Sequence, residues 1–394
     1  MKSNAVKQTK KPNIFVRLFA FLLTVLLLLG ALLLIFHRDT LNLDAVVRYF
    51  SYRSLTRSDT GEAASFSYEG NSGSLFASIG NDLLTASTSG VHLYSQSGTQ
   101  YISDTMTLGT PLISSSGDMA VVYDAGGSNL YVYQNREQVF ALTDIEGTIL
   151  SACVNDSGWL TVTTHETGYK AVITIYDSDF QKQAAFQISS SYITDASLSD
   201  DCNTLAAVAI GQQGTAFDSS VYFYQLNNIS DSQTELTPSV TYSLGNDVVL
   251  STMWQSGHLW LMQESALTVL SDDGSVLSQT DWSSRYLKSF ALSRDGFCAV
   301  LTGAYRSGTE SSLAVYAYDG SVLGETDMDV QVLSLSASGH YLSLLTSDRL
   351  STYLTNLSLY HELDSTQSAK EVLQRDDGSV FLISSTAAWL CIPD

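Results

Sequence analysis

The six histidines are the first candidates for chemistry, because imidazole binds metal ions and transfers protons near neutral pH. They are scattered along the chain, and no HxH or HExxH pattern brings two of them together. His92, His258 and His340 fall in segments expected to be strands or turns. We interpret these three as structural residues that hydrogen-bond within the fold.

The four cysteines have no spacing that suits metal or redox chemistry. Cys153, Cys202, Cys298 and Cys391 are widely separated, and no CxxC pair occurs. Zinc sites and thioredoxin-like sites use close pairs. We therefore expect most of these cysteines to be buried small apolar residues.

Short motifs for other chemistries are missing or incomplete. No GxxxxGK[ST] or GxGxxG loop occurs that would cradle a phosphate, and GNSGS at 70–74 has the character of a loop rather than of a nucleophile elbow. NDSGW at 155–159 is only a fragment of a sialidase-type Asp box, and no D-x-D-x-D-G calcium loop is present. We predict no catalytic residue, no metal ligand and no cofactor.

The elements that position the side chains are predicted to be β-strands. The chain is rich in Tyr and Val, which suit pleated and half-buried surfaces, and has 15% charged residues and only 4 Pro. The strong helix formers Lys, Glu, Gln and Arg are sparse after residue 60. This composition favours an all-β body.

Charge is distributed unevenly along the chain. Residues 1–36 contain five basic residues and no acidic one, whereas the remainder contains 14 basic and 40 acidic residues, a net charge of −26. Such a body repels phosphate backbones, so we predict that nucleic acid is not a partner. We interpret the acidity as a solubilising surface.

Residues 14–36 are predicted to form a transmembrane signal anchor that binds the lipid bilayer. This apolar run carries one charge, Arg17, near its start, and a helix of this length spans roughly 35 Å. The run is longer than the apolar region of a cleaved signal peptide and ends in bulky residues rather than at a small-x-small site. Basic residues are denser before the span, which favours a cytoplasmic tail at 1–13 and an extracytoplasmic body.

Residues 37–63 are predicted to be a juxtamembrane linker. Asp39 or Thr40 is suited to cap a short amphipathic helix that follows the span. We therefore place the protein in the cell membrane as a single-pass protein.

One sequence pattern repeats through residues 64–394. It consists of a predicted strand, a tight turn with a small or acidic pair followed by Gly, an apolar strand, and then strands rich in Tyr and Val. The residues at the first turn are Gly80, Gly117, Gly158, Cys202, Gly257, Gly296, Gly339 and Gly378. Successive copies are 37 to 44 residues apart, except for one interval of 55 that contains a polar insertion at 227–240. A period near 40 is that of a four-stranded propeller blade.

Eight turns predict an eight-bladed β-propeller, with seven blades as the alternative because the first copy is weak. The last copy ends after its third strand, and a strand at 64–70 precedes the first full copy. We predict that this early strand completes the last blade and closes the ring.

The repeated sequence pattern resembles the WD-repeat and YVTN-type propeller superfamily over residues 64–394, although Trp-Asp and Gly-His dipeptides do not recur in register. The Lys-rich start, the single span, LNLDAVVRYFSYRSLTR and the segment 66–98 together resemble an uncharacterised bacterial family of membrane-anchored propellers. That resemblance implies a domain of unknown function and no activity.

Three functions remain open on the sequence. We favour a platform for protein interaction or assembly in the cell envelope, with other envelope proteins as partners and no catalytic activity. The alternatives are a small-ligand or glycan-binding sensor and an exported lyase or glycan hydrolase. Eight-bladed quinoproteins repeat a Trp-bearing motif, whereas the five Trp residues here are irregularly placed and are expected to pack in the core.

Overall fold

The structure is a computed structural model that describes residues 18–19, 21–25, 28, 43–53, 55, 57–58, 61–71, 73–214, 216–226 and 237–393. The chain divides into two compact units, residues 1–54 and residues 55–394. Each unit is described by itself.

The described part of the first unit is helical. Helix α2 spans Leu43–Tyr52, and Asp44 in its first turn suits the positive end of the helix dipole. A short helix is therefore present within the predicted linker at 37–63, while its predicted cap at Asp39 or Thr40 lies outside the described residues. No described helix is long and apolar enough to cross a membrane. Most of the predicted span at 14–36, including Arg17, lies outside the described residues.

The second unit is a ring of eight four-stranded antiparallel sheets, which we number as blades 1 to 8. Blades 1 to 4 contain, in order, β2 Leu75–Ile79, β3 Asp82–Ser87, β4 Gly90–Tyr94, β5 Gln100–Thr105; β6 Pro111–Ser116, β7 Met119–Asp124, β8 Leu130–Gln134, β9 Glu137–Leu142; β10 Thr148–Val154, β11 Leu160–His165, β12 Ala171–Tyr176, β13 Lys182–Ile188; β14 Tyr192–Leu198, β15 Thr204–Gln213, β16 Ala216–Gln225 and β17 Val240–Gly245.

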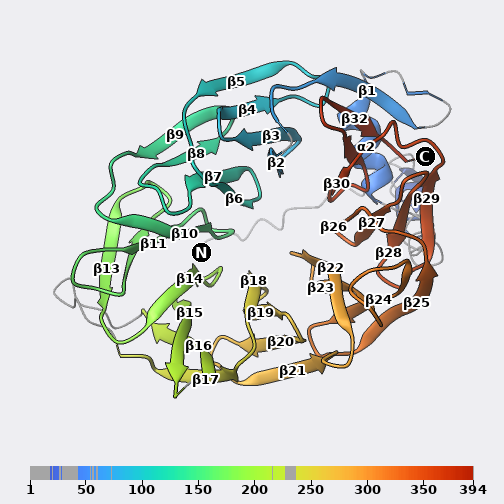
Figure 1. Ribbon diagram of the computed structural model, residues 1–394. Helices are drawn as coiled ribbons and strands as arrows, with labels where there is room; N and C mark the ends of the chain where they lie inside the picture. The colour runs from blue at the N-terminus through green and yellow to red at the C-terminus, as the bar shows by residue number, and fades with distance from the viewer. Residues whose placement is uncertain are drawn as a thin grey trace, which may run out of the picture. The chain divides into compact units, whose positions relative to one another are not determined.

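Blades 5 to 7 contain β18 Val249–Gln255, β19 His258–Gln263, β20 Ala266–Ser271, β21 Val276–Asp281; β22 Tyr286–Ser293, β23 Phe297–Gly303, β24 Glu310–Ala317, β25 Val322–Asp329; β26 Ser334–Ser338, β27 Tyr341–Leu345, β28 Leu350–Leu354 and β29 Leu359–Leu363. Blade 8 contains β30 Glu371–Gln374, β31 Val380–Ile383, β32 Ala387–Cys391 and, as its outer strand, β1 Glu62–Ser67. The predicted eight-bladed all-β propeller is confirmed, and the seven-bladed alternative is wrong (Figure 1).

The first strand of each blade lines the centre of the ring, and the last strand forms the rim (Figure 1). Middle strands such as β3, β7 and β23 are almost entirely buried because neighbouring blades cover both of their faces. Each junction from blade 1 to blade 8 holds a cluster of buried apolar side chains. Stacking of blades therefore supplies the core.

The periodic turns lie between the first and second strands of the blades, as the repeat predicted. All eight key residues have positive φ, from 53° at Gly80 to 90° at Gly296. Cys202 has the same backbone conformation, with φ of 59°, and so occupies a position that favours glycine. The polar insertion predicted at 227–240 falls in the connection from β16 to β17 and ends at the first residue of β17; residues 227–236 are outside the described part.

The ring is closed by pairing the start of the propeller with its end. Strand β1 runs antiparallel to β32, with Glu62 opposite Cys391 and Ser67 opposite Ala387. Arg57 also donates a hydrogen bond to the carbonyl oxygen of Pro393 at 3.0 Å. The predicted seam, with an early strand completing the last blade, is thus confirmed; the strand begins at Glu62 rather than at residue 64.

Candidate functional site

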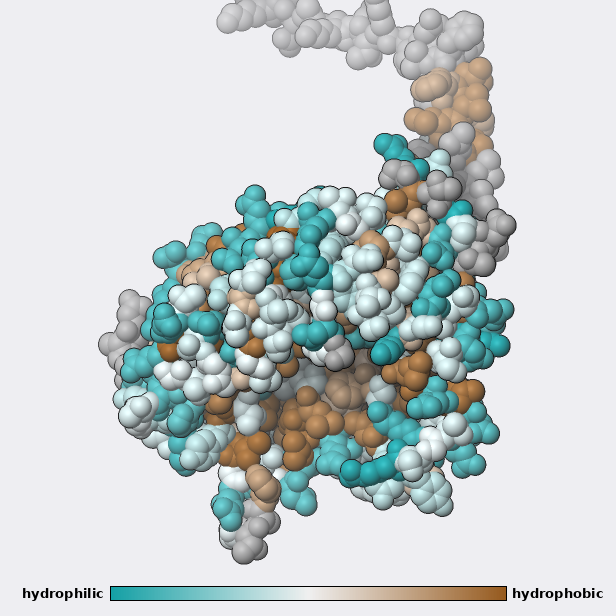
Figure 2. Space-filling model, turned by 45° about the horizontal axis from the view of Figure 1, so that its top comes forward, coloured by the Kyte–Doolittle hydropathy of each residue, from teal (hydrophilic) through white to brown (hydrophobic). Residues whose placement is uncertain are grey.

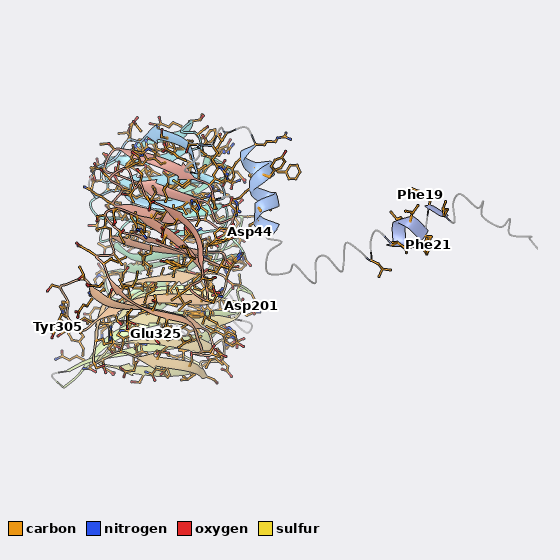
Figure 3. The ribbon with its side chains drawn as sticks, turned by 90° about the vertical axis from the view of Figure 1, so that its right-hand side faces the viewer. Phe19, Phe21, Asp44, Asp201, Tyr305 and Glu325 are labelled. Atoms are coloured by element: carbon orange, nitrogen blue, oxygen red, sulfur yellow. The ribbon has the colours of Figure 1, made fainter. Side chains whose placement is uncertain are left out.

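The propeller has two faces that differ in their connections. The turn face carries the connections between the first and second strands of each blade, including the eight periodic turns, and those between the third and fourth strands. The loop face carries the connections between second and third strands and the crossovers from one blade to the next. Seen from the side, Asp201 and Tyr305 lie on opposite faces, with Glu325 on the rim between them (Figure 3).

Hydrogen bonds between neighbouring turns run around the turn face. Ser157 Oγ donates to the carbonyl of Asp200 at 2.6 Å, and Ser293 Oγ donates to the carbonyl of Gly339 at 3.0 Å. Further links between adjacent blades are Gly80 N to Gly117 O, Ser116 Oγ to Asp156, Ser338 Oγ to Asp376 and Arg375 to Asn81. These bonds fix neighbouring turns to one another.

Arg294 crosses the mouth of the channel on the turn face. It projects from the turn between β22 and β23 in blade 6, and its guanidinium lies 2.6 Å from Asp156 in blade 3 and 2.7 Å from the carbonyl oxygen of Ser115 in blade 2. Blades 2 and 6 stand opposite one another in an eight-membered ring. The side chain therefore spans the mouth and ties its two sides together.

Asp200 lies beside this crossing and is poorly compensated. Its Oδ1 atom is buried and has no hydrogen-bond partner among the described residues. Burial, and then the nearby charge of Asp156, raise the pKa of the Asp200 carboxyl above its usual range, and Arg294 opposes them. The neighbouring Asp201 has a lowered pKa because Ser199 and Asn203 hydrogen-bond to it. Burial thus disfavours the charged form of Asp200, whereas hydrogen bonds favour the charged form of Asp201.

A cavity of about 510 Å³ lies along the channel wall of blades 2 to 5, with Arg294 at its turn-face end. Asp195 in this wall accepts hydrogen bonds from Thr252 Oγ1 at 2.6 Å and from Cys153 Sγ at 3.3 Å. Burial, with Asp195 beside it, raises the pKa of the Cys153 thiol well above its usual range. The thiol is thus protonated and donates to Asp195, so it joins blades 3 and 4 and is a poor nucleophile.

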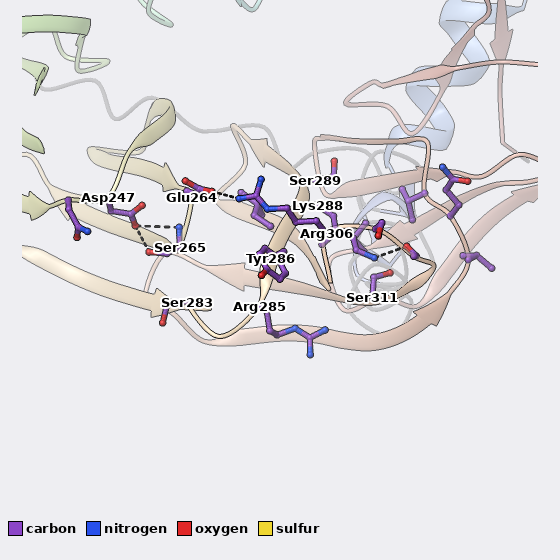
Figure 4. A pocket seen from close by; sticks show the side chains of 18 residues that line it. Asp247, Glu264, Ser265, Ser283, Arg285, Tyr286, Lys288, Ser289, Arg306 and Ser311 are labelled. Carbon is purple, nitrogen blue, oxygen red and sulfur yellow. Dashed lines mark hydrogen bonds and ion pairs between the residues drawn. The ribbon is translucent and has the colours of Figure 1, made fainter. Parts of the chain in front are cut away.

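The largest described pocket, about 790 Å³, lies on the loop face over blades 5, 6 and 7 (Figure 4). It is lined by crossovers that enter these three blades and by the 264–265 and 306–308 connections. Three basic residues, Arg285, Lys288 and Arg306, line it together with the two acidic residues Asp247 and Glu264. We call this the blade 5–7 pocket.

Lys288 owes its orientation to a β-bulge. The pairing of β22 with β23 shifts between Leu287 and Ser289, so Lys288 is the extra residue in the strand. Its ammonium group donates to the carbonyl oxygens of Gly308 at 2.9 Å and Glu310 at 2.8 Å. A side chain at Gly303 would collide with the Lys288 stem, because an added Cβ would lie 2.3 Å from Cε. Lys288 therefore fixes the loop at 304–309.

Arg306 and Tyr286 meet at the edge of the pocket. The Arg306 guanidinium lies over the Tyr286 ring, 5.4 Å from its centroid, and its Nη2 is 3.5 Å from Glu264 Oε1 (Figure 4). The side chains of Arg306 and Glu264 are 78% and 62% exposed, so their ion pair is weak. Across the pocket, Asp247 Oδ2 accepts hydrogen bonds from the Ser265 hydroxyl and amide.

Apolar side chains surround the channel mouth on the loop face. Figure 2 shows such side chains gathered in the hollow at the centre of the ring. Those at the loop-face ends of the inner strands and in the crossovers are Leu112, Val248, Leu250, Val330 and Leu333, which are 37% to 49% exposed. This mouth therefore offers aliphatic surface next to the charged groups of the blade 5–7 pocket.

The histidines singled out from the sequence are dispersed among the blades. His92 is buried in blade 1, and its Nδ1 lies 3.2 Å from the Gln100 amide. His258 stacks on Tyr318 with ring centroids 4.9 Å apart, and His340 packs on Tyr341. The described residues contain no group of three or more His, Cys, Asp and Glu side chains placed to hold a metal ion.

The remaining sequence candidates are also dispersed. All four cysteines are free thiols; Cys298 and Cys391 are buried, while Cys153 and Cys202 are half-buried. Trp254, Trp260 and Trp282 are buried in the core, and the other two tryptophans are partly buried against it. Asp156, within NDSGW, is the partner of Arg294. No candidate from the sequence lines the blade 5–7 pocket.

Sequence reasoning missed Lys288, Arg306 and Arg294. One compositional signal was available: of the ten Lys and Arg residues between 62 and 394, three line one pocket, and all three lie within the 22-residue stretch 285–306. In a body this acidic, such a cluster indicates a local site.

Comparison with solved structures supports the fold alone. The crystal structure of the C-terminal WD40 domain of Sif2 is similar to this chain with a TM-score of 0.56 and 14% identity, covering 85% of this chain and 97% of that one. The crystal structure of Hsv2 from Kluyvelomyces marxianus matches with a TM-score of 0.43 and 12% identity, covering 68% and 85%, and adds nothing to the assignment. The first match confirms the predicted resemblance to WD-repeat propellers.

No curated protein matches the chain. A family model does match, over residues 51–387, which is most of the chain and includes nearly the whole propeller. The chain therefore belongs to DUF5711, a family of unknown function.

Proposed function

We propose that this protein is an interaction platform of the cell envelope, anchored in the membrane through residues 14–36, and that it engages partner proteins with its loop face. The observation that carries this proposal is the contrast between the two faces. Neighbouring turns are bonded to one another on the turn face, where Arg294 spans the channel mouth. The loop face holds the largest described pocket and an apolar channel mouth.

A rigid ring with exposed loops suits binding better than chemistry. The blades fix the positions of the loops, and the loops on one face are free to differ from blade to blade. Loop 304–309 presents Tyr305, which is 69% exposed, at the surface. Exposed aromatic and arginine side chains next to apolar surface are typical of the centres of protein interfaces.

Site-specific photo-crosslinking of the full-length chain in its native cells tests the proposal. A photoreactive phenylalanine derivative would replace, one at a time, Tyr305 on the loop face, Asp201 on the turn face and Glu325 on the rim (Figure 3). We expect discrete protein adducts from position 305 and none from positions 201 and 325. Adducts that form equally at all three positions, or only at 201, would rule out the loop face as the interaction surface.

A further inference from the structure

We infer that the blade 5–7 pocket binds an acidic peptide segment with an aliphatic residue beside its carboxylates. The inference rests on the proposed interaction function and names the chemistry of the partner. It starts from the charges that line the pocket, which carries three basic and two acidic residues in a body with 14 basic and 40 acidic ones.

Two of the three cations in the pocket are not neutralised. Lys288 contacts the carbonyl oxygens of Gly308 and Glu310, and Arg285 contacts the hydroxyl and carbonyl oxygen of Thr302. Among the described residues, neither has a carboxylate within 4.0 Å. The charge of Lys288 therefore acts on whatever enters the pocket, whereas the side chain of Arg285 points away from Lys288 and Arg306 and adds a more distant positive charge (Figure 4).

The acidic residues of the pocket do not cancel this charge. The Asp247 carboxylate is held away from the basic side chains of the pocket, because it accepts hydrogen bonds from Ser265 and from the amide of Val248. Glu264 has only its long, exposed contact with Arg306. A ligand carboxylate that replaces Glu264 would gain a charge-assisted hydrogen bond from a guanidinium that is already positioned by Tyr286.

The other wall of the pocket is aliphatic. Val330 and Val332, in the crossover from blade 6 to blade 7, line it, and Val330 is 44% exposed. A ligand that contacts both the basic wall and the aliphatic wall must carry a negative charge and an aliphatic group close to each other. A peptide with Asp or Glu next to Leu, Ile or Val has this arrangement.

Two other classes of ligand fit less well. A nucleic acid brings many phosphates, which the net charge of −26 on residues 37–394 repels. A short acidic peptide carries few charges, and beyond a Debye length of about 8 Å the body's charge is screened from it. A saccharide would gain most from an open aromatic face to stack on, and Arg306 covers one face of Tyr286, the aromatic residue that lines the pocket.

Selection from a displayed library of random dodecapeptides on the purified full-length chain tests the inference. We expect the selected pool to be enriched in Asp and Glu adjacent to Leu, Ile or Val. A selected peptide should bind roughly ten-fold more weakly when its carboxylates are changed to amides, the equivalent of one charge-assisted hydrogen bond. Its affinity should also fall as salt is raised.

Matched variants place the binding in the pocket. The double variant Lys288→Met, Arg306→Gln should weaken binding by roughly ten-fold or more, whereas Lys182→Gln, which removes the same kind of charge from the exposed outer strand of blade 3, should leave it unchanged. Tm measurements would show whether the double variant is folded, and Val330→Asp supplies an independent variant on the other wall.

The inference is wrong if the selected pool lacks acidic enrichment, if no binder emerges, or if the double variant and Val330→Asp bind as well as the unchanged chain. Adducts at position 305 combined with such a result would reject the acidic peptide and keep the loop face as the interaction surface. Absence of adducts would reject the proposed function itself.

Discussion

At the scale of single residues, the adjacent carboxylates Asp200 and Asp201 on the turn face have pKa values shifted in opposite directions. Asp201 is held by Ser199 and Asn203, whereas Asp200 is partly buried next to Asp156. The first arrangement favours the charged form of the carboxylate, and the second disfavours it. The two residues therefore affect the stability of the fold in opposite directions as pH changes.

Asp200→Asn should raise Tm at neutral pH. The pKa of Asp200 is raised in the folded state, so its ionisation costs stability as pH rises through that pKa, and the cost is absent below the unfolded value near 3.8. The gain from the substitution should therefore shrink to zero as pH falls to about 3.8. Thermal unfolding monitored by circular dichroism between pH 3.5 and 8 measures it.

Asp201→Asn is the matched control with the opposite sign. The lowered pKa of Asp201 contributes stability above the unfolded value, and this contribution is lost as pH falls through the folded pKa. The control variant should thus lower Tm at neutral pH. If both variants changed Tm in the same direction, hydrogen-bond geometry rather than charge would explain the effects.

Part of this residue-level detail was predictable from the sequence. The periodic turn residues were found, including Cys202 in a position where the other blades have glycine, because a backbone requirement recurs at each period. Arg294, Lys288 and Arg306 were not found. Their roles depend on which loops meet across the ring and on a one-residue bulge, and neither leaves a periodic signal.

At the scale of elements, every periodic turn reverses the chain, and some of the turns also pack against the turn of the next blade. Gly257 only reverses the chain, because a Cβ added there would meet nothing within 4 Å. Gly339 does both, because its added Cβ would lie 2.6 Å from the carbonyl oxygen of Asp376 in blade 8. Both residues have positive φ, 76° and 59°.

Substituting these two glycines with alanine separates the cost of a side chain at positive φ from the cost of a clash with the next turn. Gly257→Ala should cost about 1–2 kcal/mol of unfolding free energy, the cost of a left-handed backbone with a side chain. Gly339→Ala should cost at least about 1 kcal/mol more, because the next turn must also move. Urea unfolding of both variants measures the difference. Equal costs would show that the contact between turns adds nothing to stability.

At the scale of the whole molecule, the seam between β1 and β32 decides whether the ring stays closed. Phe66 in β1 contacts Tyr94 of blade 1 and Phe381 of blade 8, with ring centroids 5.6 Å and 6.5 Å apart. Cys391 lies in β32 beside this strand, buried, and burial raises the pKa of its thiol to about 12. This cysteine is therefore a built-in reporter of the seam.

Phe66→Ala should open the seam and increase the alkylation rate of Cys391 several-fold, because the substitution removes the aromatic contacts of β1 with Phe381 in its own blade and with Tyr94 in blade 1. Cys298, which is fully buried in the middle of blade 6, serves as an internal control and should stay protected. Mass spectrometry of iodoacetamide-treated protein under native conditions reads both sites at once. Parallel increases at both cysteines would indicate global unfolding instead.

The same seam determines when the ring can close during synthesis and folding. Its two strands are the first and the last of the propeller, so more than 300 residues must be synthesised before Glu62 can meet Cys391. Closing a loop of that length costs on the order of 5 kcal/mol in chain entropy, which makes closure a late step. Until then one blade lacks its outer strand, and β1 of a second copy is an equivalent substitute. Crowded nascent chains are therefore prone to exchange this strand, and dilute ones close on themselves.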